Sequence, residues 1–182
     1  MPFVIILIVV VLLVLVVVGT RNGLVRVRNR VEKAWAQIDV QLKRRSDLVP
    51  NLVETVKGYA AHERETLDAV IKARNAAVAA STPSAASAAD AQLSGALGRL
   101  FALSEAYPDL KANQNFLALQ EELTATEDKV GYARQAYNDA VTTYNTKIQQ
   151  LPGSVFAGGM GYKPREYYQV DEAAKAAPKI QF

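Results

Sequence analysis

The chain has 182 residues, among them 21 Lys plus Arg, 18 Asp plus Glu, one His and no Cys, and its formal net charge is +3. This length accommodates one modest domain with small appendages. Without cysteine the chain has no disulfide, no thiolate metal site and no cysteine nucleophile, and the single histidine, His62, cannot build a multi-histidine cluster. The composition therefore excludes most metal and nucleophile chemistry.

The first segment of the chain is wholly apolar. Residues Phe3 to Val18 carry no polar side chain, and with residues 1, 2 and 19 they reach about 28 Å as a helix. A cleavable signal would have a basic residue before this stretch and a small-x-small site after it, and neither is present. A buried core helix is rarely apolar on all sides. Residues 1–20 are therefore predicted to be an uncleaved, single-pass transmembrane anchor.

Basic residues that follow the anchor predict its direction. Short flanks rich in Lys and Arg stay in the cytoplasm, so we expect the N-terminus outside and the body of the chain in the cytoplasm. These residues, here called the basic collar, are Arg21, Arg26, Arg28, Arg30 and Lys33. The collar either binds anionic lipid head groups or is merely solvated, and the sequence leaves both interpretations open. Nucleic-acid binding is not expected, because the collar is short and lacks interleaved aromatic residues.

The body, residues 21–151, is predicted to be helical throughout. Its apolar residues recur every three or four positions, as in helices that bury one face. No stretch alternates in the manner of a β-strand. The helices are predicted at about 24–45, 47–80, 87–107 and 113–150.

The boundary between the first two predicted helices rests on capping residues. Arg44 and Arg45 suit a helix C-terminus, Ser46 is a good N-cap, and Pro50 fits a first helical turn. A turn near Ser46 is therefore favoured over one kinked, continuous helix.

The predicted fold class is all-α: a transmembrane helix followed by an antiparallel four-helix bundle with long, coiled-coil-like helices. The last helix of the body has nearly forty residues and needs a partner along its whole length. Residues 76–84, which end near Pro83, are expected to form an exposed connection. Gly19 and Gly23 permit a hinge between anchor and body without requiring one.

Residues 152–182 form a Gly- and Tyr-rich C-terminal tail. Its large apolar groups, Phe156, Tyr162, Tyr167, Tyr168 and Phe182, either pack back on the bundle or serve as an exposed segment that docks on a partner or on the membrane surface. The glycines at 158–161 do not follow a strand and lack the Lys and Ser/Thr of a phosphate-binding loop, so no nucleotide site is predicted.

Catalytic and metal-binding patterns are not found. The adjacent pairs Glu121/Glu122 and Glu127/Asp128 point about 100° apart on a helix and are expected to be solvated. His62 lacks a nucleophile or second acid placed by a known motif, and no Glu-x-x-His repeat is present. No catalytic residue, cofactor site or metal site is predicted, and the chain is not expected to be an enzyme.

One polar pattern stands beside the apolar stripe of the last helix. Tyr137-Asn138 recurs seven residues later as Tyr144-Asn145, on nearly the same helix face, and Arg134 lies one turn before. Such residues in a helical seam usually fix register through a hydrogen-bond network. The alternative is a groove that binds a partner or ligand.

Four blocks of the sequence resemble the LemA family of bacterial membrane proteins. They are RNRV at 28–31, QIDVQLKRRSDLVPNLVE at 37–54, AYPDLKAN at 106–113, and ARQAYN at 133–138 with the Tyr144-Asn145 pair and the tail that follow. Departures are minor: Ser46 replaces a bulkier polar residue, often His, and Tyr162 and Tyr168 stand where Phe is frequent. The resemblance implies an N-terminal anchor, a cytoplasmic four-helix bundle at the bacterial inner membrane, and no established catalytic residue.

The function expected from these features is a membrane-anchored cytoplasmic scaffold or adaptor without catalysis, which self-associates as a homo-oligomer. An unidentified membrane protein is a further candidate partner. Confinement to a membrane raises the effective concentration of each copy, so weak contacts suffice for assembly. The alternative is a ligand- or partner-sensing helical module, with Tyr137, Asn138, Tyr144 and Asn145 lining a polar pocket between helices.

Overall fold

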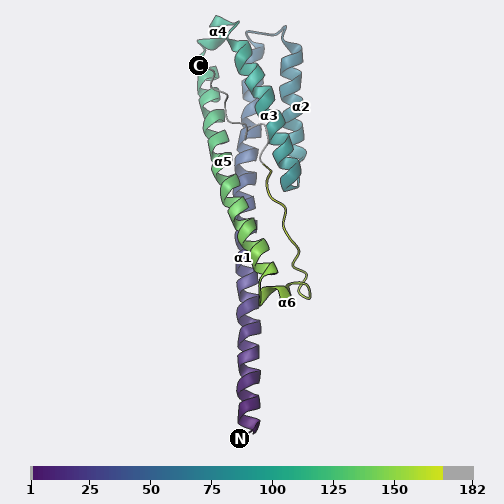
Figure 1. The fold of residues 1–182 in the computed structure, drawn as a ribbon. Helices are drawn as coiled ribbons and strands as arrows, with labels where there is room; N and C mark the ends of the chain where they lie inside the picture. Colours follow the sequence, from purple (N-terminus) through teal and green to yellow (C-terminus); the bar gives the residue numbers. More distant parts are fainter. Residues whose placement is uncertain (1, 170–182) are drawn as a thin grey trace, which may run out of the picture. The chain divides into compact units, whose positions relative to one another are not determined.

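The computed structural model describes residues 2–169, and this part of the chain contains helices and no strand (Figure 1). The helices are α1 (Pro2–Lys57), α2 (Arg64–Ala79), α3 (Pro83–Ser104), α4 (Pro108–Lys111), α5 (Gln114–Gln149) and α6 (Gly153–Ala157). The predicted all-α class is confirmed. Phe182 and the rest of the predicted tail beyond residue 169 lie outside the described residues.

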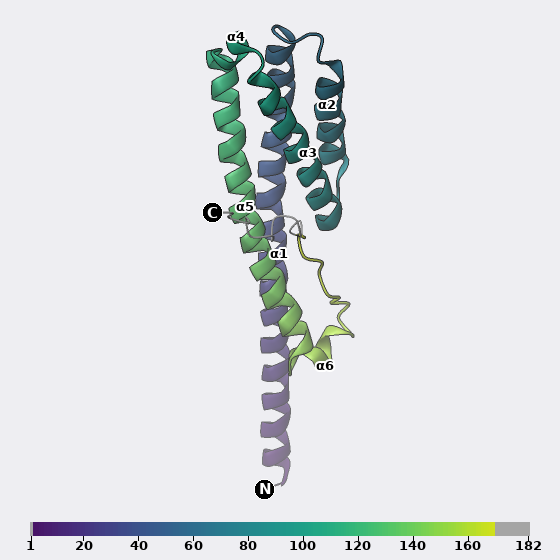
Figure 2. The ribbon, with the colours of Figure 1, turned by 45° about the horizontal axis from the view of Figure 1, so that its top comes forward.

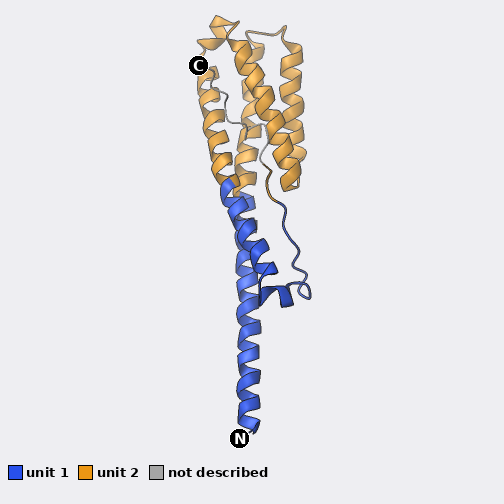
Figure 3. Ribbon diagram, viewed as in Figure 1, with its two compact units in different colours: residues 1–36, 135–166 blue, residues 37–134, 167–182 orange. Residues whose placement is uncertain are grey.

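The chain divides into two compact units (Figure 3). Unit 1 consists of residues 1–36 and 135–166, and unit 2 consists of residues 37–134 and 167–182. Both α1 and α5 contribute residues to each unit.

Unit 1 begins with the exposed apolar part of α1. In the described residues α1 is the helix long and apolar enough to cross a membrane, as judged by length and composition, and its most apolar window is not buried at all. From Leu24 onward α1 has a buried face, which it shares with the last turns of α5. On α5 the buried residues Tyr137, Val141, Tyr144 and Ile148 follow the four-three-four spacing of a helix seam.

Unit 2 holds the main hydrophobic core. Segments of α1, α2, α3 and α5 lie side by side in this unit, with α4 at one end (Figures 1 and 2). Each segment contributes large side chains to one cluster of buried residues. Its members include Leu52 and Val56 of α1, Leu67 and Val70 of α2, Leu97 and Leu100 of α3, Leu110 of α4, and Phe116 and Leu123 of α5.

The predicted turn near Ser46 is wrong, because α1 continues without a break to Lys57. Pro50 has no N–H, so the carbonyl of Ser46 loses its partner four residues later in the helix. The guanidinium of Arg74, on α2, donates its Nε hydrogen to that carbonyl at 3.3 Å. A side chain from another helix thus satisfies the group that proline leaves free, and the chain reverses only at residues 58–63.

Two other helix starts follow ordinary capping rules. Thr82 caps α3 by accepting a hydrogen bond from the backbone N–H of Ala85 at 3.2 Å, and Pro83 occupies the first turn. The predicted helix at 87–107 therefore begins earlier and includes Pro83. The Asn113 side chain accepts from the N–H of Phe116 at 3.0 Å and so caps α5.

Candidate functional site

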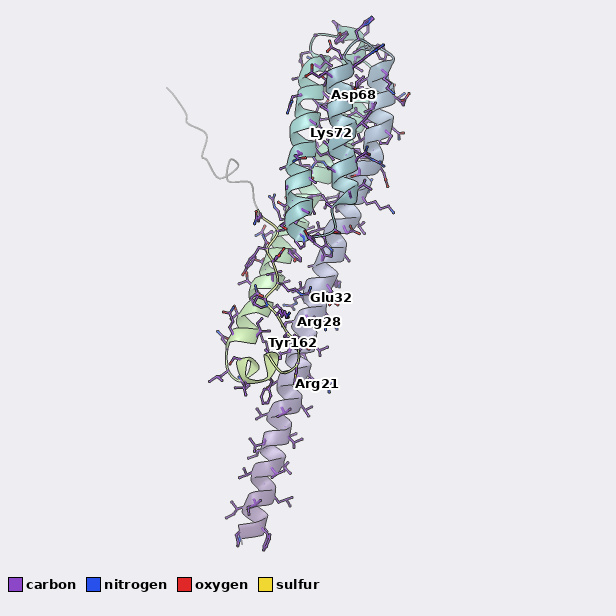
Figure 4. The ribbon with its side chains drawn as sticks, turned by 90° about the vertical axis from the view of Figure 1, so that its right-hand side faces the viewer. Arg21, Arg28, Glu32, Asp68, Lys72 and Tyr162 are labelled. Atoms are coloured by element: carbon purple, nitrogen blue, oxygen red, sulfur yellow. The ribbon has the colours of Figure 1, made fainter. Side chains whose placement is uncertain are left out.

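The basic collar lies on the part of α1 that belongs to unit 1, and all five side chains are exposed. Arg28 donates to the Glu32 carboxylate at 2.9 Å, and the guanidinium of Arg165 lies 3.6 Å from the same carboxylate. Figure 4 shows Arg28 and Glu32 on α1 beside Tyr162 of the tail. Glu32 therefore links the collar to the tail within unit 1, while contact between the collar and lipid stays a prediction.

The repeated Tyr-Asn pattern holds the tail against α5. The Tyr137 hydroxyl donates to the carbonyl of Glu166 at 2.9 Å, and the Tyr144 hydroxyl donates to the carbonyl of Lys163 at 2.9 Å. Asn145 makes two bonds: its side-chain N–H donates to the Arg165 carbonyl at 3.0 Å, and its oxygen accepts from the Arg165 N–H at 2.8 Å. We call Tyr137, Tyr144 and Asn145 the tail clasp.

Aromatic packing supports the tail clasp. The rings of Trp35 and Tyr137 have centroids 5.6 Å apart, and those of Tyr144 and Tyr162 are 6.3 Å apart. Burial raises the pKa of Tyr137, with the nearby Arg165 opposing the shift and Glu166 adding to it. The phenol therefore stays protonated at neutral pH and remains a hydrogen-bond donor to the tail backbone.

Three residues of the predicted polar network, Tyr137, Tyr144 and Asn145, bond to the tail in this way. Tyr137, Asn138, Tyr144 and Asn145 all belong to unit 1, where Asn138 is half-buried. Arg134 belongs to unit 2 and lines a cleft there. The bonding partners of the tail clasp are backbone groups of residues 163–166, so these bonds join a helix to the tail.

Unit 2 contains a second polar site, around a buried arginine. The Arg45 side chain is 2% exposed, and its guanidinium donates to Asp90 at 2.5 Å and to the Ser94 hydroxyl at 2.9 Å. The Glu127 carboxylate lies 3.1 Å from the same guanidinium and accepts from Ser94 at 3.0 Å. The hydroxyl of the buried Tyr168 points to Asp90 at 3.5 Å. These five residues are called the Arg45 cluster.

Burial dominates the electrostatics of the Arg45 cluster. Desolvation raises the pKa of Asp90, and the charge and hydrogen bond of Arg45 oppose that rise. Burial also raises the pKa of Tyr168, and the neighbouring Asp90 adds to the shift. The paired carboxylate of Asp90 and the neutral phenol of Tyr168 therefore tie α1, α3 and the tail together within unit 2.

A cleft of about 250 Å³ opens beside the Arg45 cluster. It is lined within unit 2 by Asp90, Ser94, Glu127, Arg134 and Tyr168, among others. Within the described part of the chain, the Arg45 Nε and the Gln41 Oε1 are buried without a hydrogen-bond partner. Three or more His, Cys, Asp or Glu side chains do not gather into a possible metal site anywhere in residues 2–169.

Sequence reasoning missed most of the Arg45 cluster. It assigned Arg45 to a helix end and expected Glu127 to be solvated, whereas Arg45 is buried mid-helix and Glu127 is both half-exposed and paired with it. One signal was available: Asp90 is the only acidic residue between positions 69 and 104. A single carboxylate in an Ala- and Ser-rich helix is a candidate for a buried ion pair.

Within residues 2–169, the acidic pairs singled out in the sequence and the histidine do not gather into one site. Glu122 pairs with Arg44 at 2.7 Å, with both side chains largely exposed. Glu121 and His62 are exposed.

An exposed apolar helix joined to an all-helical body defines a membrane-associated helical protein. The chain belongs to the LemA family, whose model matches residues 34–182. The chain is 31% identical to Protein LemA of Metamycoplasma hominis over 135 residues. The aligned stretch covers 72% of this chain and 60% of that protein. The family resemblance noted in the sequence is confirmed.

Magnetosome proteins share a shorter stretch of similarity with the chain. The chain is 36% identical over 81 residues to the magnetosome proteins MamQ 1 and MamQ 2 of Paramagnetospirillum magneticum, and the aligned stretch covers 44% of this chain and 30% of each relative. MamQ of Magnetospirillum gryphiswaldense is 32% identical over 80 residues, covering 44% of this chain and 29% of that protein. The chain thus spans 60% of the LemA relative and less than a third of the magnetosome proteins.

Proposed function

We propose that this protein is a membrane-anchored scaffold or adaptor of the bacterial cytoplasmic membrane, that it self-associates, and that it performs no catalysis. Residues 1–20 would be the single-pass anchor, residues 21–151 the body and residues 152–182 a C-terminal tail. The observation that carries the proposal is α1, whose apolar part has no buried residue in its most apolar window and whose later turns supply core residues. One helix thus serves as both anchor and structural element.

The helical body is proposed to be an antiparallel four-helix bundle built from α1, α2, α3 and α5. Support comes from the core cluster of unit 2, to which all four helices contribute buried side chains. Helices of this length gain most of their stability from such packing. A packed bundle presents helix faces to partners, which is what a scaffold requires.

The engagement of the polar side chains supports a structural role over a ligand pocket. An empty pocket between helices would leave Tyr137, Tyr144 and Asn145 without protein partners, yet all three bond to the tail backbone. Arg45 is likewise paired within unit 2. In the ligand-sensing alternative, the tail would have to dissociate from α5 before Tyr137, Tyr144 and Asn145 could line a ligand pocket.

The orientation is proposed to be N-terminus outside and body in the cytoplasm. It follows from the basic collar after the apolar stretch. Since the chain has no cysteine, single substitutions report its sidedness cleanly. Val78→Cys, at an exposed site on α2, is expected to react with an impermeant maleimide only after the cells are permeabilised. Pro2→Cys is expected to react in intact cells, and the reverse pattern would overturn the orientation.

Self-association is tested by the mass of the full-length protein from light scattering, in mild detergent and in lipid nanodiscs. We expect a defined oligomer in both, because membrane confinement favours contacts between copies. A monomer in both environments would remove self-association from the proposal. An oligomer that exists only in one detergent and is absent from nanodiscs would also count against it.

A further inference from the structure

Residues 151–160, which follow α5 and include α6, carry the two most exposed large apolar side chains that the described part of unit 1 has beyond the anchor, Leu151 and Val155. Leu151 is 79% exposed, Val155 is 67% exposed and Met160 is 37% exposed. Gly153 and Ala157, one helical turn apart on α6, face inward and are buried. This segment is therefore two-sided, with an inner face of small residues and an outer face of large apolar ones. We call it the apolar corner.

The apolar corner lies against the end of the apolar stretch of α1. A groove of about 300 Å³ is lined by Gly19 and Thr20 of α1 together with Lys147 and residues 150–153. A side chain at Gly153 would come within 3.8 Å of Leu24 on α1. Figure 4 shows Arg21 on this part of α1. The apolar corner thus packs beside Gly19 and Thr20, the residues with which the predicted anchor ends.

The length of the anchor fixes where that level falls in a bilayer. The sixteen residues Phe3 to Val18 span about 24 Å as a helix, against a hydrocarbon thickness of about 30 Å. The hydrocarbon therefore extends to Gly19 and Thr20, and the Thr20 hydroxyl is satisfied there by donating to the Val16 carbonyl at 2.7 Å. A corner packed beside these residues meets the boundary between acyl chains and head groups.

The charges around the corner suit an anionic leaflet. Between residues 140 and 165 the chain has Lys147, Lys163 and Arg165 and no acidic residue, and of these three Arg165 also lies 3.6 Å from the Glu32 carboxylate of α1. All three belong to unit 1, as does Arg21 on the adjacent turn of α1. Basic side chains at this depth attract anionic head groups while their apolar neighbours enter the interface.

We propose that the apolar corner is a second membrane contact, which inserts Leu151, Val155 and Met160 into the interfacial region of an anionic lipid leaflet. This inference rests on the proposed membrane anchoring by residues 1–20. The occupant of the corner is the lipid surface itself. Two contacts with the bilayer, a spanning helix and an interfacial corner, fix both the depth and the rotation of unit 1 about the α1 axis.

Spin labels on single cysteines in the full-length protein test the depth of the corner. The protein is reconstituted in vesicles of phosphatidylcholine and phosphatidylglycerol, and collision rates with oxygen and with a water-soluble nickel complex are compared. We expect labels at Val155→Cys and Met160→Cys to favour oxygen severalfold, at a depth of roughly 5–10 Å within the head-group boundary. A label at Val155→Cys as open to nickel as one in water would overturn the proposal.

Two control positions separate failure of the corner from failure of the anchor. Ala136→Cys, at an exposed site on α5 about 20 Å before its end, is expected to read as water. Val11→Cys is expected to read as deep hydrocarbon. If Val11→Cys reads as water, the anchoring itself is wrong. If Val11→Cys is deep and Val155→Cys is in water, the anchor holds and the corner proposal fails.

Two further readings test the occupant and its charge. A label at Val155→Cys shielded from both colliders would mean that protein covers the corner, a second copy for example, and would overturn the lipid contact. In vesicles of phosphatidylcholine alone the same label is expected to become shallower, since the basic residues lose their anionic partners. An unchanged depth would contradict the requirement for an anionic leaflet.

Discussion

Replacing Arg45 by Met tests whether a buried ion pair holds unit 2 together. The Arg45 and Asp90 side chains are 2% and 13% exposed and lie 2.5 Å apart, so removal of the cation leaves a buried carboxylate without its partner. Breaking such a pair costs about 3–5 kcal/mol of unfolding free energy. Glu127 adds little, because its side chain is 53% exposed. Urea unfolding of the full-length protein in mild detergent, followed by circular dichroism, measures the loss.

The neighbouring residue supplies a matched control for this experiment. Arg44 is also paired, with Glu122 at 2.7 Å, but its side chain is 52% exposed. Arg44→Met is therefore expected to cost less than about 1 kcal/mol. The double variant Arg45→Met/Asp90→Leu removes both charges and should recover much of the loss. Equal losses for the two arginines, or no recovery in the double variant, would refute the reasoning.

The same variant should change the dependence of stability on pH. Burial raises the folded-state pKa of Asp90 above its ordinary value of 3.8, and Arg45 opposes this. A raised folded-state pKa means that the folded protein binds the proton more tightly, so stability is lost as pH rises through the interval between the unfolded and folded pKa values. In Arg45→Met this interval extends to higher pH. The variant should therefore regain more stability than the unmodified protein on acidification from neutral pH, measured by the same urea titrations.

Further substitutions probe the tail, the corner and the proline in α1. Asn145→Ala removes two hydrogen bonds to the tail, so tryptic cleavage there should accelerate roughly tenfold; an unchanged rate, followed by mass spectrometry, would dismiss the tail clasp. Gly153→Ala would bring a Cβ to 2.1 Å from a backbone oxygen and should cost about 1–3 kcal/mol, measured as faster amide exchange in residues 144–157. Gly131→Ala, where a Cβ meets nothing within 4 Å, should be neutral or stabilising by about 0.5–1 kcal/mol. Arg74→Ala should cost about 1 kcal/mol in urea unfolding, and almost nothing when Pro50→Ala restores the missing N–H; equal costs in both backgrounds would contradict the role given to Arg74.

Local periodicity was enough to predict the helical class and the approximate extent of α5, because both depend on the spacing of apolar residues along the chain. The prediction of a turn at Ser46 is wrong because the helix is stabilised there by a tertiary contact, which local sequence patterns do not encode. Arg74, which satisfies the carbonyl freed by Pro50, lies 28 residues away in sequence. Local capping rules therefore mispredict a helix whose internal proline is compensated by a tertiary contact.

The candidate sites divide in the same way. The repeat of Tyr137-Asn138 as Tyr144-Asn145 is visible in the sequence, but its partners are backbone carbonyls and an N–H, which carry no sequence signature. The pairing of Arg45 with Asp90 joins positions 45 residues apart, and it depends on the packing of α1 against α3 within unit 2. The sequence shows that such residues are polar and lie beside apolar positions, but their bonding partners are determined by the tertiary structure.

The composition of the unit 2 core has a consequence for how the protein is made. The α1 residues Leu52 and Val56 share their core with Phe116 and Leu123 of α5, which are synthesised much later. At a synthesis rate of about 5–20 residues per second, several seconds pass between the synthesis of these α1 side chains and that of the α5 side chains that bury them. The interval between the synthesis of Asp90 and that of Tyr168, its neighbour in the Arg45 cluster, is longer still. During that interval the nascent chain exposes the apolar face of α1 that α5 later covers, so the unit 2 core is completed only after most of the chain has been synthesised.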